Sequence, residues 1–157
     1  MAYEFSIARR VEFSETDMAG IMHFSNYLRF MEAAEHAFFR AIGFSVAMPD
    51  RQENLGLPRV HVECDYLAPL RFEDEVEVKL LVEKRSTRSI SYRFVLRRLS
   101  PAPEVEAARG SLVVVCVRRQ ANGAFRAVAL PKRLAAQIEV APHSVLEQFA
   151  TALPRKR

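Results

Sequence analysis

The residues with the clearest potential for chemistry lie in the ten-residue segment 17–26, DMAGIMHFSN. Asp17 and Gly20 come first, His23 and Phe24 follow, and a segment with helical periodicity begins directly afterwards. Because Asp17 lies several residues before the first expected helical turn, its carboxylate is not expected to cap the helix. It is therefore available to act on another group. An acid or base beside the backbone N–H groups of a helix N-terminus is what acyl chemistry needs.

The element expected after this segment is one long helix over residues 27–44. Its apolar residues recur at steps of three and four, which is the helical pattern: Leu28, Met31, Ala34, Phe38 and Ile42. Asn26 is expected to cap this helix at its start. Gly43 is expected to lie at or near its end.

The rest of the chain is expected to be mainly strands. Residues 3–13 alternate polar and apolar, and residues 45–58 are predicted to be a loop. Further strands are expected over residues 59–67, 74–84, 88–99, 105–119 and 125–130, followed by short helices over 131–138 and 142–150. Consecutive strands with tight links favour an antiparallel sheet with the long helix on one face, an α+β arrangement. The strand 105–119 is apolar on both faces in its middle, so a second subunit is expected against the opposite face.

Composition sets ordinary bounds. The 157 residues fit one domain, expected over 1–157 with a core at about 3–130 and a basic tail at 151–157. The chain has 23 Lys+Arg against 19 Asp+Glu, a net charge of +4. This surplus fits either a soluble surface or attraction to an anionic ligand such as the phosphates of a nucleotide-bearing substrate. Basic residues are too few for a nucleic-acid platform.

The two cysteines and the hydropathy predict neither a structural metal site nor a membrane-spanning segment. Cys64 and Cys116 show no metal-ligand spacing, so no structural metal is expected, and both are predicted to be small buried residues. The N-terminus lacks the continuous apolar run of a signal peptide, and no stretch approaches the length of a membrane span. A cytoplasmic protein is expected.

Residues 13–32, FSETDMAGIMHFSNYLRFME, resemble the start of the hotdog-fold acyl-CoA thioesterases, with the 4-hydroxybenzoyl-CoA thioesterase branch as the closest likeness. Residues 65–74, DYLAPLRFED, are similar to a second stretch of that family, and the resemblance spans about residues 5–120. It implies a hotdog fold, an antiparallel sheet wrapped around one long central helix. It also implies hydrolysis of an acyl-CoA or aroyl-CoA to free acid and CoA, without a cofactor, in a homodimer or homotetramer.

The resemblance also implies roles for individual residues. Asp17 would be the catalytic carboxylate, acting either as nucleophile or as general base on water. The backbone N–H of Phe24 would polarise the thioester carbonyl, and Gly20 would permit a sharp turn and close approach of the thioester. Many short-chain relatives have Tyr-His where this chain has His23-Phe24, which is nearer to the aroyl branch but matches neither group fully. His23 is interpreted either as a pocket wall or second proton-transfer group, or as a loop residue packed against a neighbouring subunit.

The remaining candidates have two interpretations each. Tyr27 either lines an acyl pocket or belongs to the core, and His61 either contacts substrate bound to a partner subunit or is structural. Arg88 and Ser89 lie in a basic, hydroxyl-rich turn that either holds CoA phosphates or is simply solvated. Because fold alone does not determine function, a non-catalytic CoA-ester-binding module and a hydratase or dehydratase remain alternatives. The His/Asp pair on a different loop that a hydratase would require is not found.

Overall fold

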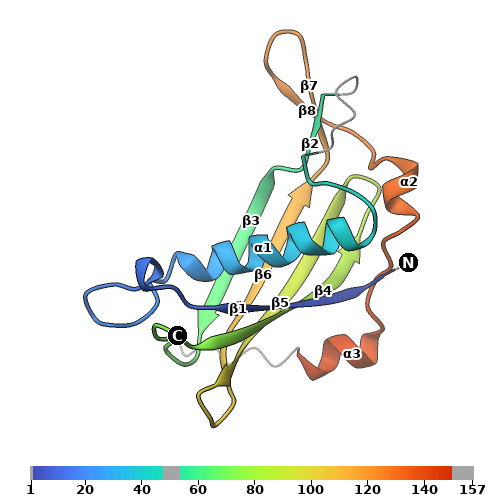
Figure 1. Ribbon diagram of the computed structural model, residues 1–157. Coiled ribbons are helices and arrows are strands. Elements are labelled where there is room, and N and C mark those ends of the chain that lie inside the picture. The colour runs from blue at the N-terminus through green and yellow to red at the C-terminus, as the bar shows by residue number, and fades with distance from the viewer. Residues whose placement is uncertain (1, 48–53, 150–157) are drawn as a thin grey trace, which may run out of the picture.

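The computed structural model describes residues 2–47 and 54–149. One long helix, α1 (Asn26–Ala41), lies across a five-stranded sheet (Figure 1). All neighbouring strands are antiparallel, in the order β1-β4-β5-β6-β3. Their bounds are β1 (Glu4–Arg10), β3 (Arg59–Tyr66), β4 (Glu75–Arg85), β5 (Ser89–Ser100) and β6 (Val105–Val115). The predicted antiparallel sheet with one helix on its face is confirmed.

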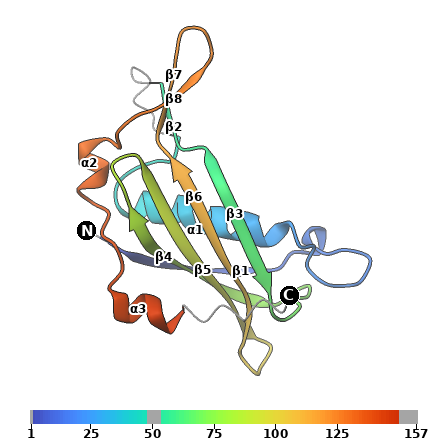
Figure 2. The ribbon, with the colours of Figure 1, turned by 180° about the vertical axis from the view of Figure 1, so that it is seen from behind.

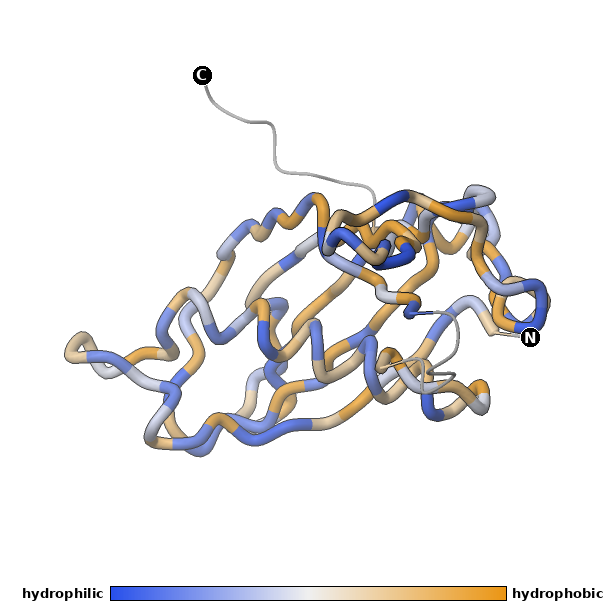
Figure 3. The backbone as a smooth tube through the Cα atoms, turned by 90° about the horizontal axis from the view of Figure 1, so that it is seen from above, coloured by the Kyte–Doolittle hydropathy of each residue, from blue (hydrophilic) through white to orange (hydrophobic). Residues whose placement is uncertain are grey.

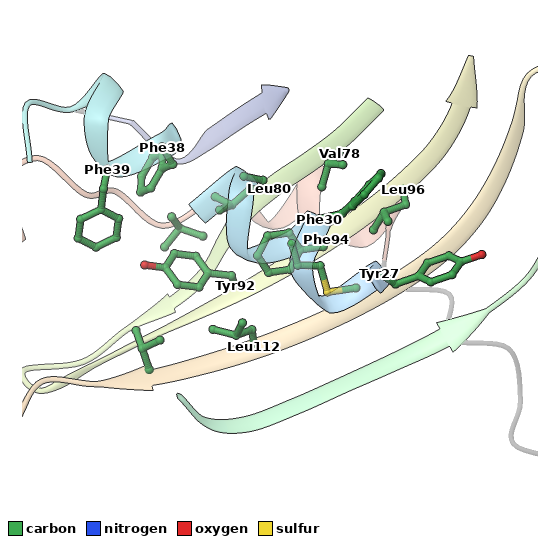
Figure 4. Close-up of a cluster of buried hydrophobic side chains, with 14 of the residues drawn as sticks. Tyr27, Phe30, Phe38, Phe39, Val78, Leu80, Tyr92, Phe94, Leu96 and Leu112 are labelled. Atoms are coloured by element: carbon green, nitrogen blue, oxygen red, sulfur yellow. The ribbon is translucent and has the colours of Figure 1, made fainter. Parts of the chain in front are cut away.

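The core lies between α1 and the sheet because alternate strand residues point to the helix. In β5, Tyr92, Phe94 and Leu96 are fully buried on this face. They pack with Phe30 and Phe38 of α1 in one cluster (Figure 4). Full burial of each such side chain stabilises the fold by roughly 1.5–3 kcal/mol. Polar and apolar residues alternate along the strands when the molecule is viewed from above (Figure 3).

A glycine in β6 leaves room for a side chain of α1. A Cβ atom built on Gly110 would lie 2.2 Å from the Cε atom of Met31 and 3.0 Å from the Glu63 carbonyl oxygen. The side chain of Met31 therefore occupies the space that any other residue at position 110 would need. Met31 thus packs directly against the backbone of β6 at Gly110.

Two boundary predictions near the N-terminus are wrong. The first strand ends at Arg10, and Phe13 instead begins the short 3-10 helix η1 (Phe13–Glu15), where 74% of its surface is exposed. Asn26 does not cap α1, because it is the first helical residue and its side-chain Nδ2 donates to the Glu15 carbonyl oxygen at 2.8 Å. The helix ends as predicted near Gly43, which has a φ of +82°.

The predicted strand 105–119 is two strands in two sheets. The backbone N–H of Cys116 donates to the Arg88 carbonyl oxygen at 2.7 Å, which continues the pairing with β5 by one residue, and the chain beyond it pairs with other strands. A small sheet follows, made of β2 (Leu55–Gly56), β7 (Val117–Arg119) and β8 (Phe125–Ala127). β8 is shorter than the predicted strand 125–130.

The C-terminal helices are also shorter than predicted, at α2 (Lys132–Ala135) and α3 (His143–Gln148). The predicted basic tail 151–157 and part of the predicted loop, residues 48–53, lie outside the described residues. Within the described ranges, no helix is both long and apolar enough to cross a membrane.

The sheet face that points away from α1, called here the outer face, is turned to the viewer in Figure 2, and it carries both apolar and charged residues. Val113 and Val115 of β6 are partly exposed on it, as the pattern predicts. Arg93 and Arg109 are also on this face, and both guanidinium groups reach backbone carbonyls at the end of α3. Part of the outer face therefore meets the chain's own C-terminal segment. The second subunit that the apolar pattern predicts against this face stays a prediction.

Candidate active site

The loop that carries Asp17 is held at both of its ends. A bridge between Thr16 and Met22 closes the loop, and the Met22 N–H donates to the Leu70 carbonyl oxygen at 2.7 Å. Inside the loop, the Gly20 N–H donates to the Asp17 carbonyl oxygen at 3.0 Å. The backbone around Asp17 is thus fixed in position beside the start of α1, where it projects from the left of the sheet in Figure 1.

Gly20 makes the turn in this loop possible. Its φ is +75°, a conformation that side-chain-bearing residues rarely adopt. A Cβ atom at this position would meet no atom within 4 Å. The backbone conformation, rather than lack of space, therefore requires glycine here. The predicted sharp turn is confirmed, while close approach of a thioester stays a prediction.

The Asp17 carboxylate is half-buried and does not cap the long helix, as predicted. Its Oδ1 atom accepts a hydrogen bond from the Ala19 N–H at 2.8 Å. Its other oxygen accepts no hydrogen bond from any described residue. One oxygen thus sets the orientation of the carboxylate and the second is open to a ligand.

The entry to α1 presents unpaired backbone donors, and the Phe24 N–H is the first of them. Across residues 2–47 and 54–149, the Phe24 N–H has no hydrogen-bond acceptor. The His23 ring lies beside it, 4.4 Å from the Phe24 ring between centroids, with Nδ1 2.8 Å from the Ser25 hydroxyl oxygen. His23 is thus tied to the helix entry, and no contact joins it to Asp17 among these residues.

Two residues that support this entry were missed by the sequence analysis. The Glu15 carbonyl oxygen accepts from the His23 N–H at 2.9 Å and from the Asn26 side chain. The Tyr66 hydroxyl donates to the Phe24 carbonyl oxygen at 2.9 Å. Tyr66 belongs to the stretch 65–74 that carries the family resemblance, so that stretch was an available signal. Glu15 likewise belongs to the stretch 13–32 that carries the resemblance, but no role was predicted for it.

Aromatic rings are concentrated around the site. The Tyr66 ring meets the Tyr27 ring edge-on at 4.9 Å between centroids, and the Phe13 ring meets Phe72 in the same way at 5.7 Å. Phe24 is 64% exposed and Tyr66 48%. Tyr27 is only 3% exposed and packs in the core, which favours the core interpretation of this residue. Burial also raises the pKa of its hydroxyl.

Two other titratable groups near α1 are not placed for nucleophilic attack. Burial raises the pKa of the Cys64 thiol to about 11, so it is protonated at neutral pH. Glu35 of α1 has no exposed surface, and its Oε2 atom pairs with Arg59 Nη2 at 2.6 Å. Burial raises the pKa of Glu35 to about 7. Its second oxygen and the Tyr92 hydroxyl are buried without partners among the described residues.

The remaining predicted site residues lie elsewhere in the chain. His61 is paired with Val113 on the outer face, where its Nε2 atom is 3.7 Å from Glu63. Arg88 and Ser89 are in the β4–β5 turn, far from the Asp17 loop in Figure 1. The Ser86 hydroxyl organises this turn by accepting from the N–H groups of both residues.

A basic cavity of about 390 Å³ opens beside the β4–β5 turn. Arg88, Arg118 and Arg126 line it together with Thr87 and Gln120. Three guanidinium groups in one cavity suit an anionic ligand such as a phosphate. No group of three or more metal-ligating side chains occurs in the part of the chain that the structure describes.

Comparisons with known proteins agree on one family. A family model described as the thioesterase-like superfamily matches residues 11–138. A putative esterase from Aquifex aeolicus is 36% identical over 94 residues, which cover 59% of this chain and 71% of that protein. The 4-hydroxybenzoyl-CoA thioesterase of Pseudomonas sp. is 26% identical over 111 residues, or 68% and 77% of the two chains.

Solved structures show the same fold. A 1,4-dihydroxy-2-naphthoyl-CoA thioesterase from Synechocystis superposes with a TM-score of 0.76 at 22% identity, covering 86% of this chain and 95% of that one. At this identity the likeness concerns the fold alone. The hotdog fold predicted from residues 13–32 is confirmed.

Proposed function

This chain belongs to the thioesterase-like superfamily, which places it with thioester hydrolases, and we propose that it cleaves an acyl-CoA or aroyl-CoA to the free acid and CoA. The proposal rests on two groups in the short segment before α1. One is the Asp17 carboxylate with its open oxygen, and the other is the Phe24 N–H, which has no acceptor among the described residues.

The reaction needs a carbonyl that is polarised and a group that delivers oxygen to it. The Phe24 N–H would donate to the thioester carbonyl oxygen, and the positive end of the α1 dipole would stabilise the negative charge that develops there. Loss of one such donor typically costs roughly 3 kcal/mol of transition-state stabilisation. The Tyr66 hydroxyl supports this donor because it donates a hydrogen bond to the carbonyl oxygen of Phe24 and so fixes the backbone of that residue.

Asp17 has two possible routes to the product. As nucleophile, its open oxygen attacks the carbonyl carbon, the C–S bond breaks, CoA leaves as thiolate, and water then hydrolyses the mixed anhydride. As general base, it takes a proton from water, whose oxygen attacks the carbonyl carbon directly. In both routes water supplies the new oxygen of the acid and the thiolate is protonated on release.

The aromatic surroundings support an aroyl group as the acyl moiety. Phe24 and Tyr66 expose ring surface directly at the helix entry. Rings stack or meet edge-on with worthwhile energy, about 0.5–1.5 kcal/mol beyond area burial. The relative from Pseudomonas carries an aroyl substrate in its name as well. Steady-state kinetics with benzoyl-type, short aliphatic and long aliphatic CoA esters test this choice, and a higher kcat/KM for an aliphatic ester would contradict it.

A homodimer would complete the binding of CoA. β3 is an edge strand with exposed Val60 and Val62, and within the described ranges no strand pairs with its free side. Antiparallel pairing of two β3 strands would bring the start of one strand to the end of the other. The basic cavity near β7 and β8 of one copy would then approach the Tyr66 end of the other copy. Arg88 and Arg126 would thereby bind CoA phosphates for the neighbouring Asp17.

The main test is the Asp17→Asn variant in a thiol-release assay. We expect kcat to fall by roughly 10²–10⁴-fold with an unchanged melting temperature, because the side chain keeps its shape and loses its charge. Glu104→Gln, a like loss of one carboxylate charge in the exposed turn between β5 and β6, is the matched control and should keep full activity. Full turnover by folded Asp17→Asn would overturn the assignment. Tight CoA-ester binding by the unaltered protein without thiol release would instead support a binding module.

Mass spectrometry of the acid-quenched protein separates the two routes. With protein in excess over substrate, an acyl group attached to the peptide that contains Asp17 is expected only if Asp17 is the nucleophile. The Asp17→Asn variant provides the blank for this measurement.

A further inference from the structure

We propose that residues 139–149 form an intramolecular cover over part of the outer face of the sheet, and that this cover prevents a second copy of the chain from packing there. The cover includes α3 and ends at Phe149. The proposal is independent of the catalytic function.

Two apolar side chains on the outer face are buried although they do not belong to the core under α1. Leu81 of β4 is 0% exposed and Val95 of β5 is 3% exposed, and neither is part of the main core cluster. Leu81 is paired with Arg93, and Val95 with Arg109, so all four side chains point to the outer face. Something other than α1 must therefore cover them.

The C-terminal segment lies against the same residues. Arg93 Nη1 donates to the Leu146 carbonyl oxygen at 3.1 Å, and Arg109 Nη1 donates to the Phe149 carbonyl oxygen at 3.2 Å. These carbonyls lie at the C-terminal end of α3, where a helix attracts cations. Lys79 adds a contact, with its Nζ atom 5.5 Å from the centre of the Phe149 ring.

Backbone bonds guide the segment onto this face. The Glu139 N–H donates to the Ala2 carbonyl oxygen at 3.0 Å, and the Ala141 N–H donates to the Val82 carbonyl oxygen at 2.8 Å. Ala141 is only 3% exposed. The segment thus meets β4 just beyond the start of β1 and continues to the arginines of the outer face.

The contact between cover and sheet is partly polar. A cavity of about 160 Å³ lies there, lined by Glu63, Glu83, Arg93, Arg109 and Phe149 among others. It has room for several waters, each of which needs roughly 30 Å³. A contact of this kind, unlike a close-packed core, is expected to be removable without loss of the main fold.

The cover lies beyond the part of the chain that the family model matches. The family model ends at residue 138, and α3 begins five residues later, at His143. The helix-facing core is complete without it, because the last member of the core cluster is Ile138. Removal of residues 142–149 would expose Leu81 and Val95 beside the partly exposed Val113 and Val115. Newly exposed apolar side chains, added to a sheet face that already exposes valines, favour association with an identical surface.

The test is the particle mass of two truncated chains, measured by light scattering after gel filtration at several concentrations. The chain ending at residue 141 lacks the cover, and we expect its mass per particle to double relative to the full chain. The chain ending at residue 149 keeps the cover and is the matched control, for which we expect no change. Equal masses for all three folded proteins would overturn the proposal.

A fluorescence measurement tests the cover in the full-length protein. The chain has no tryptophan, so Phe149→Trp introduces a single reporter at the end of α3. We expect blue-shifted emission with weak acrylamide quenching, and a shift to solvent-like emission when Arg109→Ala is added. Solvent-like emission from the single variant alone would show that the segment does not rest on the sheet, which contradicts the proposal even if the truncated chain fails to fold.

Discussion

Two carboxylates are associated with α1, and their surroundings differ in almost every respect. Asp17 lies in a loop before the helix, half-buried, with one oxygen bonded to a backbone N–H and the other open. Glu35 lies inside the helix, fully buried and paired with Arg59. Burial raises the pKa of Glu35 to about 7. A strongly perturbed pKa would nominate Glu35 as catalytic, whereas access to a ligand nominates Asp17.

The sharpest way to test this comparison is to neutralise each acid in turn. We expect Asp17→Asn to lose roughly 10²–10⁴-fold in kcat and to keep its stability. Glu35→Gln is expected to keep kcat within a few-fold, because its neighbours on α1 and β3 lie away from the helix entry. Thiol release and thermal unfolding of both variants measure the two effects. A reversed pattern would make Glu35 the functional acid.

The pH dependence of the free energy of unfolding tests the burial of Glu35 without activity data. The folded pKa of Glu35 is about 7 against an ordinary value of 4.5, so between these pH values the folded protein holds a proton that the unfolded chain has released. The free energy of unfolding therefore falls as pH rises, by about 3 kcal/mol in total from this group. This stabilisation is complete below pH 4.5 and lost above pH 7.

Urea unfolding at pH 5 and pH 8 measures this loss, with Glu35→Gln as the reference that carries no titrating acid at position 35. The difference between the two proteins should change with pH. An identical difference at both pH values would show that Glu35 has an ordinary pKa.

A third test concerns the contact between Met31 of α1 and Gly110 of β6, because both acids are associated with this helix. Gly110→Ala places a methyl group where Met31 now lies, and we expect destabilisation of about 1–3 kcal/mol from overpacking. The double variant with Met31→Ala should recover part of this loss, because it removes the clashing atoms. Unfolding of the single and double variants measures the coupling. If the two losses add, the close contact is not what makes glycine necessary.

The smallest effect is expected for the hydroxyl that supports the helix entry. Tyr66→Phe removes the hydrogen bond to the Phe24 carbonyl oxygen and keeps the ring contact with Tyr27. A neutral hydrogen bond contributes about 0.5–1.5 kcal/mol, so a few-fold decrease in kcat is expected. Tyr3→Phe is a control outside the site. A decrease as large as that of Asp17→Asn would place the Tyr66 hydroxyl in the chemistry itself.

The parts of the fold that could be predicted from the sequence are those that periodicity determines. The alternation in residues 76–82 and 90–96 identified the faces that meet α1, because burial of one face requires it. The end of the helix at Gly43 followed from local backbone chemistry. The break at Cys116 could not be predicted, because residues 105–119 read as one run and the pairing of residues 117–119 with β2 and β8 depends on other segments of the chain.

The same distinction applies to the candidate site. Asp17, Gly20 and Phe24 are close in the chain, so one motif placed them together. Asn26 was assigned to capping because that is its commonest role at a helix start, and its bond to Glu15 depends on how η1 folds back. His61 and Arg88 are not brought to Asp17 within one chain, and their predicted roles depend on a second copy.

The hydrogen bond between Tyr66 and Phe24 joins residues 42 positions apart. Such non-local contacts form late, since the entropy of closing a long loop must be overcome first. The helix entry would therefore gain its final geometry only after the strand that carries Tyr66 has docked. In refolding, recovery of enzymatic turnover is expected to lag behind the return of helical circular dichroism, and the lag would report the time that the sheet needs to assemble.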